Sequence, residues 1–467
     1  MEEIPRPPTK PVVGNLLDIN RESPVEGLMA LAREYGPIFR LTVFDREVVF
    51  VSNFALGDEL CDTDRFEKKV GPGATQARAF AGDGLFTAYN EEPNWQKAHN
   101  ILLPAFGQQA MRDYFPMMVD IGQQLVKKWQ RLNPDDDIQV TVDTTRLTLD
   151  TIGLCGFGYR FNSFYRETPH PFVEAMTRCL TAGLERSSRP PIAEKLNVRE
   201  QRQFDADVAF MNEMVDTLVK QRRTHPEGET GKVDLLARML SGVDRETGQR
   251  LDDVNIRYQV ITFLVAGHET TSGLLSFSLY LLLRHPDVLA RAYAEVDQVL
   301  GSDPSVPPAY QQMRQLKYVS QILKEALRLY PPAPAINLQP RADEEVIGGK
   351  YRITRQNGAT LLTGSMHRDP SVWGDDAESF NPDHFGEEAE RQLPPNAFKP
   401  FGNGQRACIG RQFALLEATL VLGLILQRFE LVDHRHYELK LHETLTVKPA
   451  DFTIKVRVRR APAAVLA

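Results

Sequence analysis

A glycine-rich loop around a single cysteine has the clearest potential for chemistry in this chain. Cys408 stands near the end of residues 400–410 (PFGNGQRACIG), and an apolar helical pattern begins near Gln412. Glycines let a backbone approach another group closely. A sulfur just before a helix start feels the positive end of the helix dipole, which favours the metal-binding thiolate. The alternative is a small buried cysteine that only fills a turn.

A second unusual segment is the run AGHETT at residues 266–271, inside the helical pattern Val254–Arg284. Glycine costs about 1 kcal/mol relative to alanine in a helix, so we expect something to compensate. We expect the small side chains of Ala266 and Gly267 to open a groove for dioxygen, and the Thr270 hydroxyl to bond an earlier carbonyl. Ordinary helix packing is the alternative. His268 is interpreted as a polar face residue rather than a metal ligand.

Two further pairs share a helix face. Glu325 and Arg328 are three residues apart among leucines, and Trp95 and His99 are four apart. An exposed pair such as Glu325–Arg328 contributes only about 0.3–0.5 kcal/mol, so alone it predicts little. Trp95 and His99 present an indole N–H and an imidazole on one side. Alone, they are typical of an interface aromatic and a surface histidine.

These segments together resemble the signatures of the cytochrome P-450 family. The cysteine signature is matched by Phe401, Gly402, Gly404, Arg406, Cys408 and Gly410, the oxygen-helix signature by Ala266, Gly267, Glu269 and Thr270, and the Glu-x-x-Arg signature by Glu325 and Arg328. The resemblance implies that Cys408 is the thiolate ligand of a haem iron, which favours O–O cleavage. It implies that Phe401 tunes the sulfur and that Arg406 pairs with a haem propionate.

Further roles follow from the same resemblance. It places Lys68, Trp95 and His99 at the haem edge, assigns oxygen binding and proton delivery to the run from Ala266 to Thr270, and makes Glu325 and Arg328 a lock of the haem-side core. One departure stands out: His384, in the downstream segment 380–385 (FNPDHF), occupies a position where the family usually has an arginine. The two-pronged contact of arginine is lost there.

Residues 82–87, 147–157 and 262–277 resemble one branch of the family, the bacilli-type fatty-acid hydroxylases whose haem domain is fused to a flavin reductase. That likeness runs from about Pro5 to Val458. It implies that Phe86 steers the substrate chain over the haem and that Arg46 pairs with a fatty carboxylate at the mouth, beside Phe50, where the branch has a tyrosine. It also implies a channel lined by Ala74, Ala77, Ala81, Val265, Ala333 and Leu445.

The elements that must position these residues are mostly helices. Three- and four-residue apolar spacing predicts helices over Gln108–Leu132, Val142–Cys155, Glu200–Arg223, Val254–Arg284, Asp287–Leu300, Tyr318–Tyr330 and Gln412–Arg428. Alternating patterns predict a hairpin of Ile38–Thr42 and Glu47–Ser52 and a strand at Phe452–Val458. Loops are predicted at Glu185–Asn197, Thr224–Lys232, Gly301–Pro308 and Glu387–Pro395.

We therefore expect a mainly α fold with small β-sheets (α+β), with haem between the oxygen helix and the cysteine-loop helix. No linker divides the chain, so we expect one haem domain over residues 1–460 and a tail or linker start at 461–467.

Composition narrows the classes of function. The net charge of −7 disfavours a nucleic-acid partner. The first residues carry charges and prolines without an apolar run, so we expect neither a signal peptide nor a membrane anchor. The apolar stretches Val260–Gly267 and Ala418–Leu426 are shorter than the ~20 residues of a membrane span and predict buried helices. Four scattered cysteines favour a cytoplasmic location.

The predicted function is that of a haem b monooxygenase. We expect it to hydroxylate medium- or long-chain fatty acids, or similar apolar chains, at subterminal carbons with O2. No GxGxxG nucleotide-binding unit is present, so electrons must come from an NADPH-dependent reductase carrying FMN and FAD, either fused or separate. A peroxide-driven peroxygenase or dehydratase and a non-catalytic haem sensor are the alternatives. Glu269 and Thr270 argue against the first, and the absence of a signalling domain argues against the second.

Overall fold

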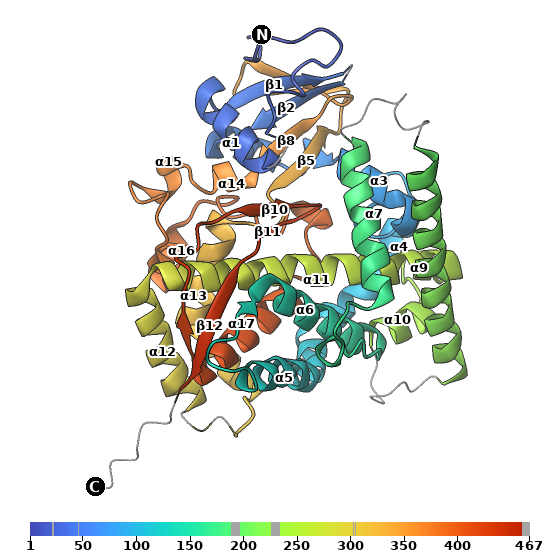
Figure 1. Cartoon of the computed structure of the whole chain (residues 1–467). Helices are drawn as coiled ribbons and strands as arrows, with labels where there is room; N and C mark the ends of the chain where they lie inside the picture. Colours follow the sequence, from blue (N-terminus) through green and yellow to red (C-terminus); the bar gives the residue numbers. More distant parts are fainter. Residues whose placement is uncertain are drawn as a thin grey trace.

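A five-stranded sheet forms the β-rich lobe at the top of Figure 1. The computed structural model describes residues 1–20, 23–44, 46–187, 197–225, 234–301, 303 and 305–459. The strands are ordered β1 (Ile38–Val43), β2 (Arg46–Val51), β8 (Ala359–Leu362), β5 (Ala335–Pro340) and β3 (Phe66–Lys68). β1 and β2 form the predicted antiparallel hairpin, with Val43 opposite Arg46. β2 and β8 run parallel, so the sheet joins distant parts of the chain.

Helices form the larger body below this lobe (Figure 1). They are α1 (Pro24–Tyr35), α2 (Phe54–Leu60), α3 (Pro72–Ala81), α4 (Pro93–Leu102), α5 (Gln108–Gln130), α6 (Val140–Phe157), α7 (Pro171–Ser187), α9 (Val198–Thr224), α10 (Leu235–Ser241), α11 (Asp253–Arg284), α12 (Pro286–Leu300), α13 (Lys317–Leu329), α14 (Thr363–Met366), α15 (Pro370–Trp373), α16 (Glu387–Gln392) and α17 (Arg411–Arg428).

The long helix α11 crosses the middle of the helical body (Figure 1). The Asp252 carboxylate caps it by accepting the Asn255 N–H. Its buried residues lie on all sides, as the apolar run from Val260 predicted. α6 packs directly against it. A Cβ at Gly267 would lie 2.9 Å from Cγ1 of Ile152, so the missing side chain lets the two helices approach.

A short hairpin carries the C-terminal chain back to α11. It pairs β10 (Leu441–Glu443) with β11 (Val447–Pro449), and Leu445 lies in its turn. A Cβ at Gly273 would lie 3.0 Å from the Val447 carbonyl oxygen, so the hairpin touches the central helix. The other strands form two small sheets, β4 (Ile138–Gln139), β12 (Thr453–Val458) and β9 (Phe429–Val432) in that order, and β6 (Glu344–Ile347) with β7 (Tyr351–Thr354).

The mainly α fold with small sheets is confirmed. Both ends of each predicted helix lie within two residues of the ends of an observed helix. One predicted loop is wrong, because Glu387–Pro395 contains α16 with its i,i+4 pair Glu387–Arg391. Most of the predicted loops at 185–197 and 224–232 lies outside the described residues, as does the proposed domain boundary at 460.

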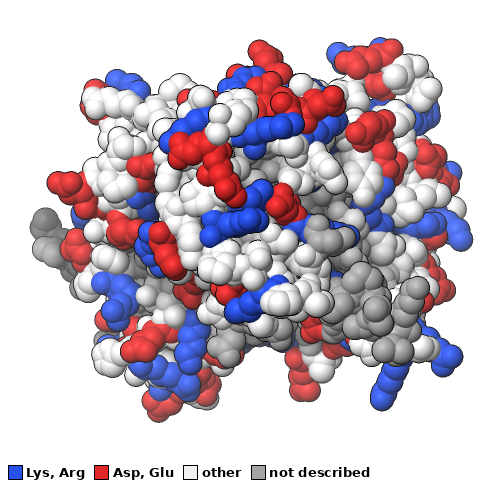
Figure 2. Space-filling model, turned by 90° about the horizontal axis from the view of Figure 1, so that it is seen from above, with Lys and Arg blue, Asp and Glu red and all other residues white. Residues whose placement is uncertain are grey.

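The surface seen from above mixes Lys and Arg with Asp and Glu, and no single charge dominates that face (Figure 2). Within the part of the chain that the structure describes, no helix combines the length and the apolar character that a membrane crossing requires.

Candidate active site

The cysteine loop is held open by glycine geometry. Gly402 and Gly404 have φ of +82° and +60°, a region that side chains disfavour. The Cys408 N–H donates to the Phe401 carbonyl at 2.7 Å, which closes the loop. α17 begins three residues later with Gly410 as its N-cap. Cys408 is exposed, whereas Cys61, Cys155 and Cys179 are buried, so its sulfur is the accessible one.

Opposing influences act on the sulfur of Cys408. Although the residue is exposed at the surface, the protein around its sulfur raises the pKa of the Cys408 thiol by desolvation, while the Gly410 N–H and Arg411 act in the opposite direction. The helix start therefore favours the thiolate, as predicted, against this desolvation. A coordinated metal ion removes a thiol proton outright. The exposed sulfur of Cys408 is thus suited to a metal that supplies the missing positive charge.

Two cations beside the loop have no acidic partner among the described residues. Arg406 donates to the side-chain oxygen of Asn90 at 3.1 Å and to the Ala88 carbonyl at 2.6 Å, and it lies 4.5 Å from the Trp95 ring. Burial lowers the pKa of Arg406 to about 10. Lys68 is close enough that Arg406 adds to the effect of burial, which lowers the pKa of Lys68 to about 7. Both groups would be stabilised by an anion.

Trp95 and His99 complete this cationic corner. Their rings stack on α4 with centroids 4.9 Å apart. Nδ1 of His99 is buried and has no hydrogen-bond partner among the described residues. Burial and the neighbouring Arg406 lower the pKa of His99. The four residues predicted at the haem edge are therefore brought together. Arg406 and Lys68 donate only to neutral oxygen atoms among the described residues, so their charges fit the carboxylates of a haem.

The oxygen helix is open where the sequence predicted. Ala266 is exposed although the three residues before it are buried. The Thr270 hydroxyl donates back to the Ala266 carbonyl at 2.9 Å, as predicted. Gly267 instead faces Ile152, so its missing side chain serves the packing of α6 rather than the groove alone. His268 is not a polar face residue, because it is 1% exposed.

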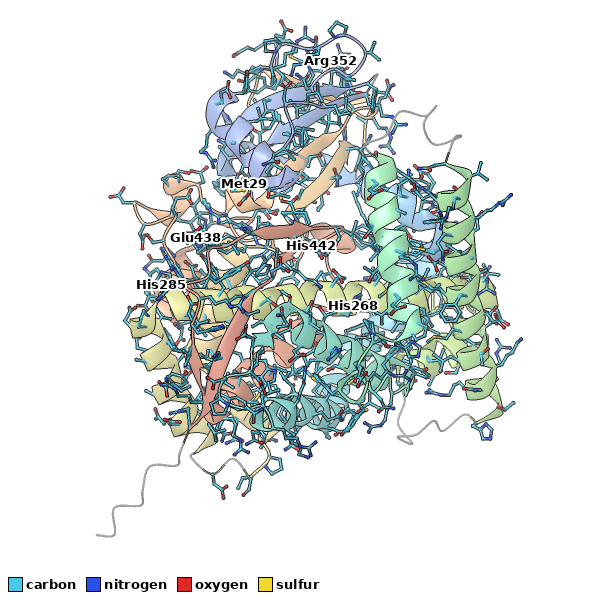
Figure 3. The ribbon with its side chains drawn as sticks, viewed as in Figure 1. Met29, His268, His285, Arg352, Glu438 and His442 are labelled. Carbon is cyan, nitrogen blue, oxygen red and sulfur yellow. The ribbon has the colours of Figure 1, made fainter. Side chains whose placement is uncertain are left out.

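Glu269 lies in a polar cluster to one side of this opening. Its Oε1 is 3.0 Å from Nε2 of His268 and 3.0 Å from Nζ of Lys448, and its Oε2 accepts from the Thr446 hydroxyl at 3.0 Å. Burial alone would raise the pKa of Glu269, but Lys448 and His268 hold it well below its usual range. Figure 3 labels His268 in the middle part of α11.

The Glu325–Arg328 pair is fully buried, and two Arg328 nitrogens each lie 2.7 Å from a Glu325 oxygen. Arg328 also donates to the carbonyls of His367, Ala377 and Ser379. His384 joins the pair, because its Nδ1 lies 3.1 Å from Glu325 Oε1. The imidazole therefore keeps the contact for which an arginine was expected.

The proposed channel residues are only partly brought together. Ala74, Ala77 and Ala81 are buried on α3. Ala77 and Leu445 line one apolar cavity of about 10 Å³, roughly one water in size, with Gly73, Phe80, Cys179, Leu180 and Gly183. Val265 is buried, whereas Phe86 and Ala333 are exposed. Neither Phe86 nor Ala333 lines this cavity.

The two residues predicted at the channel mouth differ in their exposure. Arg46 is exposed at the start of β2 and forms no ion pair with any described residue. Phe50 is buried and stacks on Phe39 with ring centroids 5.1 Å apart. The position of Phe50 therefore favours a role in the core over contact with a ligand.

Sequence reasoning missed several residues of the site. Lys448 and Thr446 hold Glu269 from a distant hairpin, and Asp376 holds His384 from a loop. Phe106 lies 3.8 Å from where a Cβ of Gly410 would be and stacks on Phe263 of α11, so it links the cysteine loop to the oxygen helix. No local pattern marks these residues, because each acts across a long separation in sequence.

Comparison with known proteins identifies the family of the chain. The family model for cytochrome P450 matches residues 4–456. The bifunctional cytochrome P450/NADPH–P450 reductase 1 of Bacillus subtilis is 53% identical over 460 residues, covering 98% of this chain and 43% of that protein. The corresponding bifunctional protein of Bacillus cereus is 53% identical over 458 residues, covering 98% and 42%. A self-sufficient cytochrome P450 monooxygenase of Phanerodontia chrysosporium is 43% identical over 465 residues, covering 99% and 43%.

The chain therefore belongs to the cytochrome P450 family. Haem is the cofactor of that family. The chain spans about two fifths of the length of the curated relatives it matches.

Proposed function

We propose that the chain is the haem-binding, oxygen-activating part of a monooxygenase that hydroxylates medium- or long-chain fatty acids or similar apolar chains at subterminal carbons. The observation that carries the proposal is the placement of Arg406. It shares the loop of the exposed Cys408 and has no acidic partner among the described residues. One short loop thus offers a sulfur for a metal and a charge for an anionic cofactor edge.

When bound, haem supplies the one-electron and O2 chemistry that side chains cannot. Cys408 would hold its iron through the sulfur. Lys68, Arg406 and His99 would bind the haem carboxylates with donors that have no acidic partner, and Trp95 would keep the Arg406 guanidinium in place by stacking. Phe401, whose carbonyl accepts the Cys408 N–H, would limit water at the sulfur and so tune its electron donation.

Proton delivery falls to the open part of α11. The Thr270 hydroxyl gives its hydrogen to the Ala266 carbonyl, so its oxygen lone pairs remain to accept from a water or another donor at the exposed face. Glu269, the residue before Thr270, is the nearest acid on that helix. Ala266 leaves space for a small ligand beside Thr270.

Electrons would come from an NADPH-dependent reductase with FMN and FAD. The support is that the Bacillus relatives are named as cytochrome P450 joined to an NADPH–P450 reductase, and this chain matches only part of each. Whether the reductase is fused or separate, the chain itself would supply binding, orientation and proton control. A cytoplasmic location fits this arrangement and stays a prediction.

Fatty-acid recognition rests on Arg46 and on the apolar side chains of α3 and the hairpin turn. An exposed arginine without an acidic partner among the described residues suits a carboxylate at a channel mouth. Ala74, Ala77, Ala81, Val265, Ala333, Phe86 and Leu445 would contact the chain of the substrate. Several of these side chains are small, so the channel would accept a bulky or flexible chain.

The test combines binding with product analysis on the haem-loaded chain. Fatty acids, alcohols and amides of matched length are titrated while the iron spin state is followed, and products are identified with an NADPH-dependent flavin reductase present. We expect Arg46→Ala to weaken the binding of fatty acids about tenfold, because one charge-assisted contact is lost, and to leave the binding of alcohols unchanged. Arg245→Ala, at an exposed arginine elsewhere, is the matched control. Absence of hydroxylated product from every class would overturn the proposal.

A further inference from the structure

The carboxylate of Glu269 is tied to a different part of the chain from the opening it is expected to serve. Lys448 and Thr446 reach it from the β10–β11 hairpin, and His268 reaches it from the same helix. These three are the charged or hydrogen-bonding side chains that face Glu269 among the described residues. All three act as donors toward it, so the carboxylate has no hydrogen to give.

Helix geometry separates Glu269 from Thr270. Consecutive residues point about 100° apart round an α-helix, whereas residues four apart share a face. Ala266 and Thr270 therefore form one line, joined by their hydrogen bond. Glu269 lies to the side of that line and faces the hairpin. A proton can leave Glu269 toward Thr270 only if the side chain first receives one.

Lys448 is built as a partner for Glu269. The residue is 8% exposed, and its Nζ lies 3.0 Å from Glu269 Oε1 and donates to the Thr145 hydroxyl of α6 at 3.2 Å. A buried ammonium is costly unless it is paired and hydrogen-bonded, and here both conditions hold. The ring of His268 is fixed in turn, because its Nδ1 lies 2.7 Å from the Leu264 carbonyl oxygen.

We infer that Lys448 is a positioning residue for proton delivery, which holds the ionised Glu269 carboxylate in one place against the hairpin, beside the line of Ala266 and Thr270. Lys448 keeps its own proton in this role, because a paired ammonium favours the ionised form of its carboxylate partner. The inference rests on the proposed function for its purpose, although the contact itself does not.

The β10–β11 hairpin that holds Glu269 also carries a residue of the apolar cavity. Thr446 and Lys448 follow Leu445, which lines the apolar cavity with Ala77. The residues that hold the acid and the residue expected to touch substrate therefore belong to one short turn and strand. A chain seated against Leu445 would act on the same backbone that presents Lys448 to Glu269.

The experiment compares Lys448→Met, Lys448→Arg and the unaltered haem-loaded chain with its reductase. Lys448→Met keeps the length and removes the charge, and Lys448→Arg keeps the charge. Lys455→Met is the matched control, because Lys455 on β12 pairs with the fully exposed Asp135 at 3.6 Å. Product per NADPH and peroxide release are measured from about pH 6 to about pH 9, where an untethered buried carboxyl would titrate.

We expect the product per NADPH of the unaltered chain to stay almost constant over this range. In Lys448→Met the burial of Glu269 is less opposed, so the Glu269 carboxyl loses its proton within the range. Product per NADPH should then fall roughly tenfold toward high pH, with a matching rise in peroxide release. Lys448→Arg should restore the flat profile. A uniform loss at every pH, or an unchanged profile, would overturn the inference.

An infrared measurement on the resting protein separates this inference from the proposed function. Lys448→Met should show a new protonated-carboxyl band toward low pH, and this band should be absent from the Lys448→Met/Glu269→Gln double variant. No new band would overturn the inference even if hydroxylation is observed. If no substrate is hydroxylated, the proposed function fails, while the infrared band still reports the Lys448–Glu269 contact. Should Lys448→Met not fold, Lys448→Gln serves in its place.

Discussion

The imidazole of His384 lies 3.1 Å from the carboxylate of Glu325, where the family resemblance predicts an arginine. Its other nitrogen lies 3.1 Å from Asp376, so both ring nitrogens face oxygen atoms that only accept. Both nitrogens must then carry hydrogen, which is the charged form of histidine. The structure therefore replaces a permanent charge in the core with one that titrates.

This replacement predicts a pH-dependent stability. Burial opposes the charge, but Glu325 and Asp376 raise the pKa of His384 above its ordinary value. The stabilisation is thus fully present below the unfolded pKa of about 6.5 and is lost as pH rises through the folded pKa. We expect the unaltered chain to unfold a few degrees above His384→Gln in mild acid and the gap to shrink at higher pH. His384→Arg should remove this dependence, and a gap constant with pH would contradict the assignment.

The carboxyl of Glu417 gives a second pH dependence of stability. It is fully buried on α17, and the nearby Thr151 side chain offsets that burial only in part. Burial raises the pKa of Glu417 to about 8. The folded chain therefore keeps a proton that the unfolded chain loses near pH 4.3, so stability falls as pH rises between about 4.3 and 8.

Glu417→Gln, neutral at every pH, should remove this fall. Calorimetry should give the variant a higher unfolding temperature than the parent near pH 8, with little difference in acid. Glu438→Gln, at a surface glutamate, is the control. Equal pH dependence in parent and Glu417→Gln would show that Glu417 is already ionised in the folded state.

The sequence predicts the parts of this site that are local. Cys408, Arg406 and the glycines lie within one loop, and Ala266 to Thr270 within two helical turns, so their spacing carries the information. Apolar periodicity likewise predicts long helices such as α11. Short elements such as α16 and β5 have too few residues for a period to emerge.

Contacts between distant segments could not be predicted in the same way. Lys448 meets Glu269 only because the hairpin returns to α11 across Gly273. His384 finds Asp376 through a loop, and the cations Lys68 and Arg406 meet from β3 and the cysteine loop.

Arg406 should govern how firmly the cofactor is held. Arg406→Leu removes a charge that no acid of the described chain satisfies, so we expect haem transfer to an acceptor protein to speed about tenfold, the equivalent of one charged hydrogen bond. Arg391→Leu, at an exposed arginine of α16, should leave the rate unchanged. Equal rates for Arg406→Leu and the parent would remove Arg406 from the haem edge.

Thr270 should control coupling rather than binding. Thr270→Ala removes the hydroxyl that bonds the Ala266 carbonyl at the open part of α11. We expect peroxide release to rise and product per NADPH to fall roughly tenfold, since proton delivery then lacks its positioned hydroxyl. Thr270→Ser keeps a hydroxyl and should retain most of the coupling. If Thr270→Ala couples as well as the parent, Thr270 has no part in proton delivery.

The most direct test of the account is the absorption spectrum of the reduced, carbon-monoxide-bound protein. Thiolate ligation by Cys408 predicts a strongly red-shifted Soret band. In Cys408→His, haem should still bind through Arg406, Lys68 and His99, and the red shift should disappear. An imidazole-type spectrum in the unaltered chain, or a red shift that survives in Cys408→His, would contradict the assignment of Cys408 as the iron ligand.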